Sequence, residues 1–261
     1  MTDIENSPFI SAAIVTYNAE KTVMPAIESI YKYTRRYPVN ICVFDNASSD
    51  ETVSLVKKSG LAQVVGLEKN EGFGAGHNEI LKHGMGKYHF VINPDITVSS
   101  DVISDIADFM EENPDIVMCM PKILNSDGTE QKLPKEIPTF KRMFLGRLAP
   151  LSKRFKKIRD DYIWADRDLT GVTDIDFCSG CFFCVRSEAF KKLGGFDERF
   201  FMYLEDADIT LRAKKLGRVV IAPQFSVTHL WERESAKSLK YMIIHTDSAF
   251  KFIRKKREHK K

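Results

Sequence analysis

The stretch FISAAIVTYN (residues 9–18) decides the fold that the sequence predicts. It is a continuous apolar run that ends in polar residues, and the runs VNICVF (39–44) and YHFVI (88–92) end in the same way. Continuous apolar runs, in contrast to alternating ones, are typical of parallel strands covered on both faces. Segments of helical character separate these runs, so we predict an α/β protein with a doubly wound, mostly parallel sheet.

Outward from these runs, strands and helices alternate as far as residue 121. The predicted order is strand 9–15, helix 23–36, strand 39–44, helix 51–58, strand 63–67, helix 75–83, strand 88–92, helix 101–112 and strand 116–121. In such sheets, ligands bind at the carboxyl ends of the strands. The polar residues at those ends are Thr16, Tyr17, Asn18, Asp45, Asn46, Asn70 and Asp95.

The second half of the chain is less regular. We predict a hairpin at 122–133, a mobile insertion with little periodicity at 134–172, a strand at 175–186, and helices at 187–193 and from Glu205. Between residues 237 and 256, apolar positions keep helical spacing, which predicts an amphipathic helix. Its apolar stripe is Leu239, Met242, Ile243, Thr246, Phe250 and Ile253.

Length and composition indicate a globular protein. The chain has 261 residues, of which 43% are hydrophobic, enough for one well-buried α/β domain with an extension. Its first residues, MTDIENSPF, are polar and acidic and lack the layout of a secretory signal. No run approaches the ~18 apolar residues of a membrane span. We therefore expect a cytoplasmic protein.

The charges are segregated along the chain. Residues 141–159 carry eight Lys or Arg and no acid, and residues 251–261 carry seven Lys or Arg and one Glu, although the net charge is only +3. Two cationic segments on an otherwise acidic chain indicate anionic partners, such as phospholipid or a phosphate-bearing acceptor. Neither segment belongs to a recognisable nucleic-acid module, so we do not expect a nucleic-acid partner.

The five cysteines fit a reducing compartment better than a disulfide framework. Cys178, Cys181 and Cys184 form a C-x2-C-x2-C pattern, which could hold zinc or an iron–sulfur cluster. The pattern lies in DFCSGCFFCVR, an apolar segment typical of a buried strand, where thiols behave as small hydrophobic groups. We therefore predict no metal there.

Three short polar segments carry the chemistry. They are Asn93-Pro94-Asp95 after YHFVI, Glu205-Asp206-Ala207-Asp208 after RFFMYL, and His229 after FSVT. Oxygen ligands with one imidazole suit Mg²⁺ or Mn²⁺, and a separate carboxylate suits a general base. Each segment alone also fits a structural role: a proline turn, acids in the first turn of a helix, and a strand-end histidine. Together they indicate an enzyme that acts on a diphosphate-linked substrate.

The glycine-rich segment NEGFGAGHNE (70–79) does not predict a dehydrogenase. A dinucleotide fingerprint is G-x-G-x-x-G after the first strand, and both the spacing and the place differ here. We interpret the glycines as positions where backbone approaches a nucleotide or its diphosphate at the start of helix 75–83.

These segments together resemble the inverting glycosyltransferases of family 2, which have the GT-A fold, and within them the bacterial rhamnosyltransferase-like branch. The resemblance covers residues 9–230 in order. It rests on AAIVTYNAEKTV (12–23), VFDNASSDET (43–52), NEGFGAGHN (70–78), INPDI (92–96), the segment 178–217 and His229. It implies one domain at 1–236, with a nucleotide-sugar half (9–121) and an acceptor half (122–236), followed by the helix and basic tail at 237–261.

The resemblance also implies roles for particular residues. Asp206 would be the catalytic base, Asp95 and His229 would bind Mg²⁺ or Mn²⁺, and Asp45 would accept a hydrogen bond from the pyrimidine ring. The acceptor side would comprise Glu205, Ser179 and Gly180. The nucleotide side would comprise Thr16, Tyr17, Asn18, Asp45, Asn70, Gly72, Asn93 and Asp95.

Two departures from the family pattern bear on the substrate. Asn93 replaces the first acid of the D-x-D-type motif, a form that resembles the rhamnose-using members. After His229 comes Leu230-Trp231-Glu232-Arg233, where the family commonly has a small glycine-containing turn.

We therefore expect dTDP-L-rhamnose as the donor, with a UDP-sugar as the alternative, and a lipid-linked saccharide acceptor in cell-surface polysaccharide synthesis. The enzyme would be peripheral to the inner face of the membrane. A catalytically silent nucleotide-binding subunit and a nucleotidyltransferase remain open. The apolar stripe of the last helix has three candidate partners: the anionic membrane surface, the domain itself, and a second subunit in a homodimer.

Overall fold

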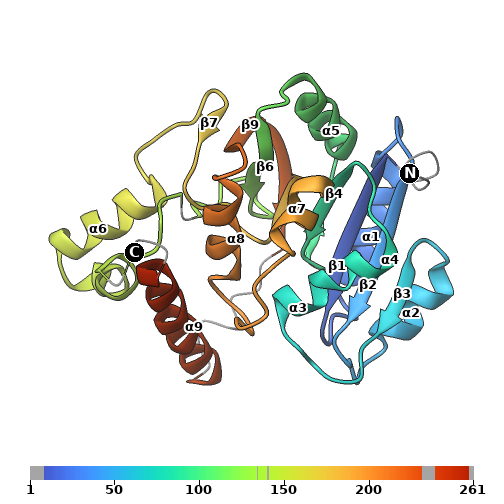
Figure 1. Cartoon of the computed structure of the whole chain (residues 1–261), viewed down its shortest axis with the longest axis horizontal. Helices are drawn as coiled ribbons and strands as arrows, with labels where there is room; N and C mark the ends of the chain where they lie inside the picture. The colour runs from blue at the N-terminus through green and yellow to red at the C-terminus, as the bar shows by residue number, and fades with distance from the viewer. Residues whose placement is uncertain (1–8, 134, 140, 231–238, 259–261) are drawn as a thin grey trace.

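The computed structural model describes residues 9–133, 135–139, 141–230 and 239–258 (Figure 1). These residues form one nine-stranded sheet in the order β3-β2-β1-β4-β8-β6-β9-β5, with β7 paired to β9. The strands are β1 (Ile10–Thr16), β2 (Val39–Asp45), β3 (Gln63–Gly66), β4 (Tyr88–Ile92), β5 (Ile96–Thr97), β6 (Ile116–Leu124), β7 (Thr173–Asp174), β8 (Phe182–Arg186) and β9 (Arg218–His229).

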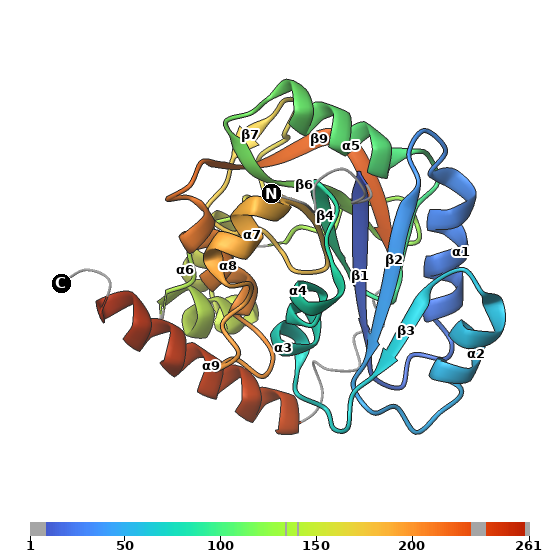
Figure 2. The ribbon, with the colours of Figure 1, turned by 45° about the vertical axis from the view of Figure 1, so that its right-hand side comes forward.

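Helices lie on both faces of this sheet. Figure 2 shows α1 and α2 on one face and α3, α4, α7 and α8 on the other. The helices are α1 (Val23–Tyr33), α2 (Thr52–Ser59), α3 (Phe73–Asn78), α4 (Ile80–His83), α5 (Val102–Glu112), α6 (Lys153–Ile163), α7 (Ser187–Leu193), α8 (Glu205–Ala213) and α9 (Leu239–Glu258), with a π-helix at Lys141–Leu145 and a 3-10 helix at Gly146–Leu151. No helix among the described residues combines the length and the apolar character needed to cross a membrane.

The sheet confirms the predicted fold class. Strand β1 pairs in parallel with β2 and β4, β2 with β3, and β6 with β9. The apolar runs that predicted these strands are buried on both faces, as their lack of alternation requires. Antiparallel β8 joins the two parallel parts by pairing with β4 and β6. The two halves predicted from the sequence therefore share one sheet.

Several element boundaries differ from the prediction. Of the predicted strand 175–186, only 182–186 is a strand, β8, and the short β7 lies just before the predicted range. The backbone between them bonds to other elements, as Cys178 N–H does to Thr210 Oγ1. The predicted helix 75–83 is divided at Glu79 into α3 and α4. The expected hairpin at 122–133 has a single antiparallel bridge, Leu124 to Glu130. The predicted irregular insertion contains α6, a helix in which charged residues outnumber apolar ones.

The hydrophobic core has two parts. The main cluster surrounds the sheet and includes the buried cysteines Cys178, Cys181 and Cys184, which are free thiols. A second, smaller cluster lies where α8, α9 and the insertion meet. Its buried members are Met143, Phe177, Phe200, Leu204, Ala207, Ala249 and Phe252. Helix α9 thus packs against the domain.

The face of α9 that packs differs from the predicted apolar stripe, of which Ile253 packs against the second core cluster. Ser248, Ala249 and Phe252 are buried, whereas the stripe residues Met242, Ile243 and Phe250 are 51–62% exposed. Serine and alanine carry too little hydrophobicity to reveal the packed face in the sequence. Figure 1 shows α6 and α9 at the same end of the molecule, so the cationic segment 141–159 lies near the described part of the cationic C-terminal segment.

Candidate functional site

One cleft collects most of the predicted site residues. It has a volume of about 560 Å³ and opens where β1 and β4 end, facing the start of α8. The predicted residues that line it are Tyr17, Asn18, Asn93, Asp95, Ser179, Gly180, Glu205, Asp206 and His229. The sequence did not single out Gln131, Leu133, Met202, Tyr203 and Tyr241, which also line it.

Four predicted nucleotide residues are not among those that line this cleft. Thr16 and Asp45 are buried opposite each other on β1 and β2, and Thr16 Oγ1 donates to Asp45 at 2.7 Å. Asp45 also accepts hydrogen bonds from the backbone N–H and the hydroxyl of Ser48, so its carboxylate organises the loop after β2. Asn70 accepts from the N–H of Gly72. The nucleotide roles of these residues remain predictions.

The glycines of the 70–78 segment are packed against the protein itself. Gly72 has φ +96°, and a Cβ there would lie 2.0 Å from the carbonyl oxygen of Phe201. A Cβ on Gly74 would meet Phe196, and one on Gly76 would meet Val15. These glycines therefore permit close approach between segments of this chain, and their contact with a nucleotide remains a prediction.

Asp95 and His229 lie side by side on the floor of the cleft. They are neighbours because β5 pairs antiparallel with β9, so Ile96 lies opposite His229. Asp95 Oδ1 is 3.2 Å from His229 Nε2. The two residues are far apart in sequence, and only this strand pairing brings them together.

Gln131 holds the His229 ring in one orientation. Its side-chain N–H donates to the His229 carbonyl at 3.1 Å, which directs Oε1 to the ring Nδ1 at 3.0 Å. An amide oxygen only accepts, so Nδ1 carries a proton. In the neutral ring, Nε2 then presents its lone pair toward Asp95, as an imidazole that binds a metal requires. Gln131 is buried, and nothing in the sequence marked it.

The Asp95–His229 pair fits two neighbouring ligands of an octahedral cation. Ligands about 2.1 Å from Mg²⁺ at right angles to each other lie about 3 Å apart. The observed 3.2 Å separation is close to this value. No group of three or more His, Cys, Asp or Glu side chains is arranged to hold a metal ion among the described residues. A cation held here would therefore need oxygen ligands from a substrate or water.

Asp206 lies across the cleft, in the first turn of α8. Its Oδ2 accepts from the N–H of Gly180 at 3.0 Å and its Oδ1 from the N–H of Ala207 at 2.9 Å. Burial raises the pKa of Asp206 to about 6, against the opposing effect of these N–H groups. The carboxylate is therefore ionised at neutral pH and is a stronger base than an exposed aspartate. Its two hydrogen bonds hold it in one orientation.

The neighbouring Glu205 is in a different state. It is 5% exposed, and its Oε2 has no hydrogen-bond partner among the described residues. Burial, followed by the charge of Asp206, raises the pKa of Glu205 well above its ordinary value. The fold thus favours the neutral form of Glu205, whereas Asp206 has two N–H partners that favour its carboxylate, a difference typical of catalytic sites.

A strained turn delivers Asp206 to the cleft. Tyr203 and Leu204, directly before α8, have φ values of +71° and +68°. This left-handed conformation costs on the order of 1–3 kcal/mol for each non-glycine residue and persists only when surrounding contacts enforce it. Leu204 is buried in the second core cluster, which provides such contacts. No glycine or asparagine marks this turn, so the sequence did not reveal it.

Comparisons with known sequences identify the family of this chain. The profile of the family "Glycosyl transferase family 2" matches residues 11–194. The N-acetylglucosaminyl-diphospho-decaprenol L-rhamnosyltransferase of Mycobacterium tuberculosis is 25% identical over 271 residues, which cover 97% of this chain and 85% of that protein. The rhamnosyltransferase WbbL of Escherichia coli is 24% identical over 262 residues, which cover 94% and 92% of the two chains.

The fold also matches solved structures. GalNAc-T7 with UDP, GalNAc and Mn²⁺ superimposes with a TM-score of 0.66 at 19% identity. The match covers 88% of this chain and 45% of that one, so this chain spans less than half the length of GalNAc-T7. At this identity the likeness establishes the GT-A fold alone.

Proposed function

This chain belongs to glycosyl transferase family 2, and we propose that it moves L-rhamnose from dTDP-L-rhamnose to a hydroxyl of a lipid-linked glycan, with inversion at the sugar carbon. The observation that carries this proposal is the arrangement of one cleft. A pair of metal-ligand side chains, Asp95 and His229, lines it together with a hydrogen-bonded, ionised Asp206. Transfer from a nucleoside diphosphate needs both functions, charge stabilisation on the leaving group and proton removal from the acceptor.

The donor would lie between the ends of β1 and β4. Tyr17 is 51% exposed at the cleft edge, where its ring can stack on the base. Asn18 has φ +52° and bonds through its backbone and side chain to Ser48 and Ser49, which holds this edge in shape. Asn93 places an uncharged amide where the diphosphate would lie, and Asp95 adds one negative charge.

Asp95 and His229 would hold a Mg²⁺ or Mn²⁺ ion. When bound, such a cation supplies Lewis-acid stabilisation of the charge on a leaving diphosphate. Gln131 keeps the proton on His229 Nδ1, so Nε2 remains available as a ligand. The Mn²⁺ in the GalNAc-T7 structure supports a divalent cation on this fold. Activity should accordingly disappear in excess EDTA and return with Mg²⁺ or Mn²⁺; full activity after thorough chelation would contradict the metal role.

Asp206 would take the proton of the acceptor hydroxyl as that oxygen attacks the sugar carbon. Its raised pKa makes it a better proton acceptor while it stays ionised at neutral pH. The N–H groups of Gly180 and Ala207 orient it toward the cleft. One displacement from the face opposite the leaving group inverts the configuration of the sugar carbon.

The names of the relatives support the donor and the acceptor. Both curated relatives are rhamnosyltransferases by name, and one name includes a diphospho-decaprenol acceptor. The second candidate function is transfer from a UDP-sugar, which the UDP in the GalNAc-T7 structure favours. A silent nucleotide-binding subunit would not need the ionised Asp206, and a nucleotidyltransferase would release pyrophosphate from a nucleoside triphosphate.

One experiment separates these functions. The protein is incubated with dTDP- and UDP-sugars plus Mg²⁺ or Mn²⁺, and free nucleoside diphosphate is measured with and without a polyprenyl-diphosphate-linked N-acetylglucosamine acceptor. Release of dTDP from dTDP-L-rhamnose, stimulated by the acceptor, is the expected result. Release from UDP-sugars alone would replace the donor. Nucleotide binding without any release would indicate the silent subunit, and pyrophosphate from a nucleoside triphosphate would indicate the nucleotidyltransferase.

The exposed side of α9 supports docking on an anionic membrane, where a lipid-linked acceptor would be found. Met242, Ile243 and Phe250 present apolar side chains that the domain does not cover. Helix α6 and the end of α9, both rich in Lys and Arg, lie at the same end of the molecule (Figure 1). Basic residues near an anionic surface contribute about 1 kcal/mol each before screening. We therefore propose that the enzyme docks on the inner face of the cell membrane.

Co-sedimentation with vesicles tests this location. Replacing Met242, Ile243 and Phe250 together with serine should reduce binding to vesicles that contain anionic lipid, and added salt should weaken binding of the unchanged protein. Tyr31→Ser, a change at a residue 64% exposed on α1, is the control. Equal sedimentation of all three proteins would refute the surface. A loss of dimerisation in the triple variant would assign the stripe to a second subunit.

A further inference from the structure

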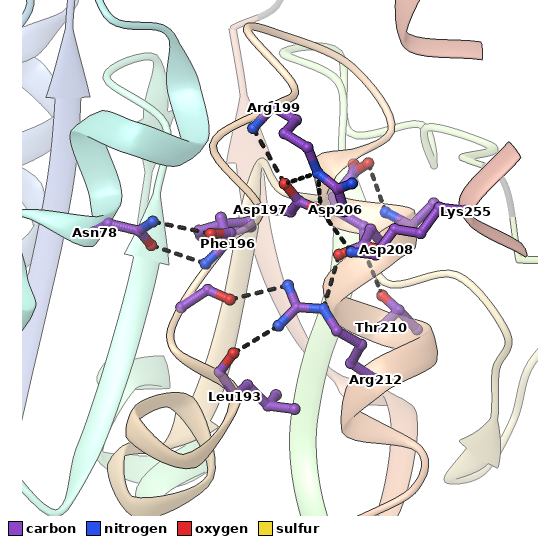
Figure 3. A network of polar contacts seen from close by, with 12 residues as sticks. Asn78, Leu193, Phe196, Asp197, Arg199, Asp206, Asp208, Thr210, Arg212 and Lys255 are labelled. Carbon is purple, nitrogen blue, oxygen red and sulfur yellow. Dashed lines mark hydrogen bonds and ion pairs between the residues drawn. The ribbon is translucent and has the colours of Figure 1, made fainter. Parts of the chain in front are cut away.

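The segment between α7 and α8, residues 194–204, lies between the two halves of the protein. On the nucleotide-sugar side, the N–H of Phe73 donates to the carbonyl of Phe201 at 2.9 Å. The Asn78 side chain donates to the carbonyl of Phe196 and accepts from its N–H, at 2.9 and 2.8 Å (Figure 3). At its other end the segment enters the strained turn and then Asp206. We call residues 196–204 the base loop.

Helix α9 holds the base loop at three places. Ser248 Oγ donates to the Met202 carbonyl at 2.8 Å, and Lys251 Nζ donates to the Arg199 carbonyl at 2.8 Å. Lys255 Nζ lies 2.6 Å from Asp197 Oδ2. In addition, Ala249 and Phe252 pack beside Phe200 and Leu204 in the second core cluster. The helix therefore contacts the loop along most of its length.

Lys255 joins the loop to the helix that carries the base. Its Nζ also lies 2.5 Å from Asp208 Oδ1 on α8, and its side chain is only 12% exposed (Figure 3). Asp208 is in turn bound by Arg212, which donates to the carbonyls of Leu193 and Gly195. The hydrogen bonds from Arg199 and Lys255 hold the pKa of Asp197 well below its usual range, so these pairs are charged at neutral pH. Lys255 thus bridges the carboxylates of Asp197 and Asp208, and Asp208 lies two residues after Asp206 on α8.

The other end of α9 reaches the cleft itself. Tyr241, in its first turn, lines the cleft together with Met202 and Tyr203 of the base loop. The His245 ring, one turn later, lies 5.3 Å from the Tyr203 ring. The same helix therefore contributes a cleft wall at one end and the Lys255 bridge at the other.

We propose that α9 contributes residues to the active site. Lys255 is a positioning residue that holds the base loop and α8 in the arrangement that aims Asp206, and Tyr241 contacts the glycan acceptor. This inference rests on the proposed transferase function. It assigns to the chain's last helix a role beyond attachment to a membrane, and it names the residues that carry that role.

The Lys255 ammonium group can be removed without unfolding the protein, because each carboxylate that it contacts has a second cationic partner. Asp197 keeps Arg199 and Asp208 keeps Arg212 when Lys255 is absent, so neither buried carboxylate is left without a cation. Lys255→Met preserves the length and apolar stem of the side chain and removes only the ammonium group. The strained turn before Asp206 would then have one restraint fewer.

Two measurements on Lys255→Met test the proposal. The kcat with dTDP-L-rhamnose and the polyprenyl-diphosphate-linked acceptor should fall about 10- to 100-fold, as expected when a base is misplaced by about 1 Å, with the dissociation constant of dTDP unchanged. Amide hydrogen exchange should accelerate in residues 197–207 and stay unchanged in β1, β2 and β4. Lys255→Arg should recover part of the activity. Lys240→Met, an exposed lysine on the same helix, is the control.

The two measurements distinguish failure of this proposal from failure of the transferase function. If exchange accelerates in residues 197–207 of Lys255→Met but the unchanged protein turns over no sugar donor, the positioning role of Lys255 stands and the transferase function is refuted. Normal exchange and normal kcat in Lys255→Met would refute the positioning role of Lys255 and would not affect the proposed transferase function. A dissociation constant of dTDP that rises together with a general acceleration of exchange would show that Lys255 stabilises the whole fold, which would also overturn its role as a positioning residue.

Discussion

The two walls of the cleft are built in different ways. One wall, which we call the donor wall after its proposed role, follows the ends of two adjacent parallel strands and comprises Tyr17, Asn18, Asn93 and Asp95. The other wall, which we call the acceptor wall after its proposed role, comes from a loop, the start of α8 and helix α9. It comprises Ser179, Gly180, Met202, Tyr203, Glu205, Asp206 and Tyr241. The donor wall is positioned by the ladder of a central sheet. The acceptor wall is positioned by side-chain contacts among segments that are distant in sequence.

This difference indicates which wall tolerates change. A sheet ladder spreads its restraint over many backbone hydrogen bonds, so one side-chain substitution on the donor wall leaves the geometry in place. The acceptor wall depends on a strained turn and on single contacts such as Ser248 to Met202. We therefore expect donor-wall substitutions to affect binding of nucleotide or cation, and acceptor-wall substitutions to affect turnover or acceptor binding.

The largest effect should come from Asp206 on the acceptor wall. Asp206→Asn removes the base and should reduce kcat by at least about 10², the lower range for general-base removal, with little change in the dissociation constant of dTDP. Asp161→Asn, an exposed change on α6, is the control. Turnover near that of the unchanged enzyme would contradict the assignment of Asp206 as the base and would make Glu205 the next candidate.

The pH dependence of the unchanged enzyme provides a second check on Asp206. The base must be ionised, and burial raises its pKa to about 6. The kcat should therefore be level near neutral pH and fall by about tenfold per unit as the pH drops below about 6. A profile that stays level down to pH 4 would contradict the raised pKa.

The next effect concerns Gln131, which supports the donor side. Gln131→Ala frees the His229 ring and should raise the Mn²⁺ or Mg²⁺ concentration for half-maximal activity by about 10- to 100-fold, the usual effect of losing a residue that orients a metal ligand. The kcat at saturating cation should change less. Gln131→Glu, which keeps the oxygen that accepts from the ring, should show the smaller change. An unchanged cation requirement in both variants would remove His229 from the cation site.

A smaller effect is expected at Tyr241. Tyr241→Ala removes an aromatic contact worth about 0.5–1.5 kcal/mol and should raise the KM for the acceptor by about 2- to 10-fold. The dissociation constant of dTDP should not change, since Tyr241 belongs to the acceptor wall. Tyr241→Phe should behave like the unchanged enzyme if the ring face makes the contact. A change in dTDP affinity without a change in acceptor KM would place Tyr241 on the donor side.

The smallest effect on turnover should come from Glu205. Its neutral form is favoured in the fold, so Glu205→Gln should change kcat at pH 7 by less than about tenfold. The stabilisation from a raised carboxyl pKa is complete below the ordinary glutamate value and is lost as the pH rises through the folded value. The Tm of the variant relative to the unchanged protein should therefore increase with pH, by on the order of a few degrees. A Tm difference that is independent of pH would show that Glu205 ionises normally.

The donor half was largely predictable, because its information is local. Apolar runs of 5–7 residues predicted β1, β2 and β4, and the polar residues after them predicted the cleft edge. The insertion was less predictable, because α6 has a highly charged surface. The packed face of α9 was also missed, since the residues with the strongest apolar periodicity, Met242, Ile243 and Phe250, are the exposed ones. Trp231, Glu232 and Arg233, which depart from the family pattern, lie outside the described residues.

The sequence by itself determined the fold class and the chemical groups of the site, since apolar continuity, glycine positions and acidic segments are properties of the chain in order. It also indicated Asp95, Asp206 and His229 as members of one site through their resemblance to a family. Only the tertiary structure decided which atoms face each other. The pairing of β5 with β9 places His229 beside Asp95, Gln131 orients the ring, and Lys255 reaches Asp197 and Asp208. These contacts join residues about 50 to 130 positions apart in sequence. Such residues become neighbours only when the sheet and its helices have packed, so no local sequence pattern predicts their contact.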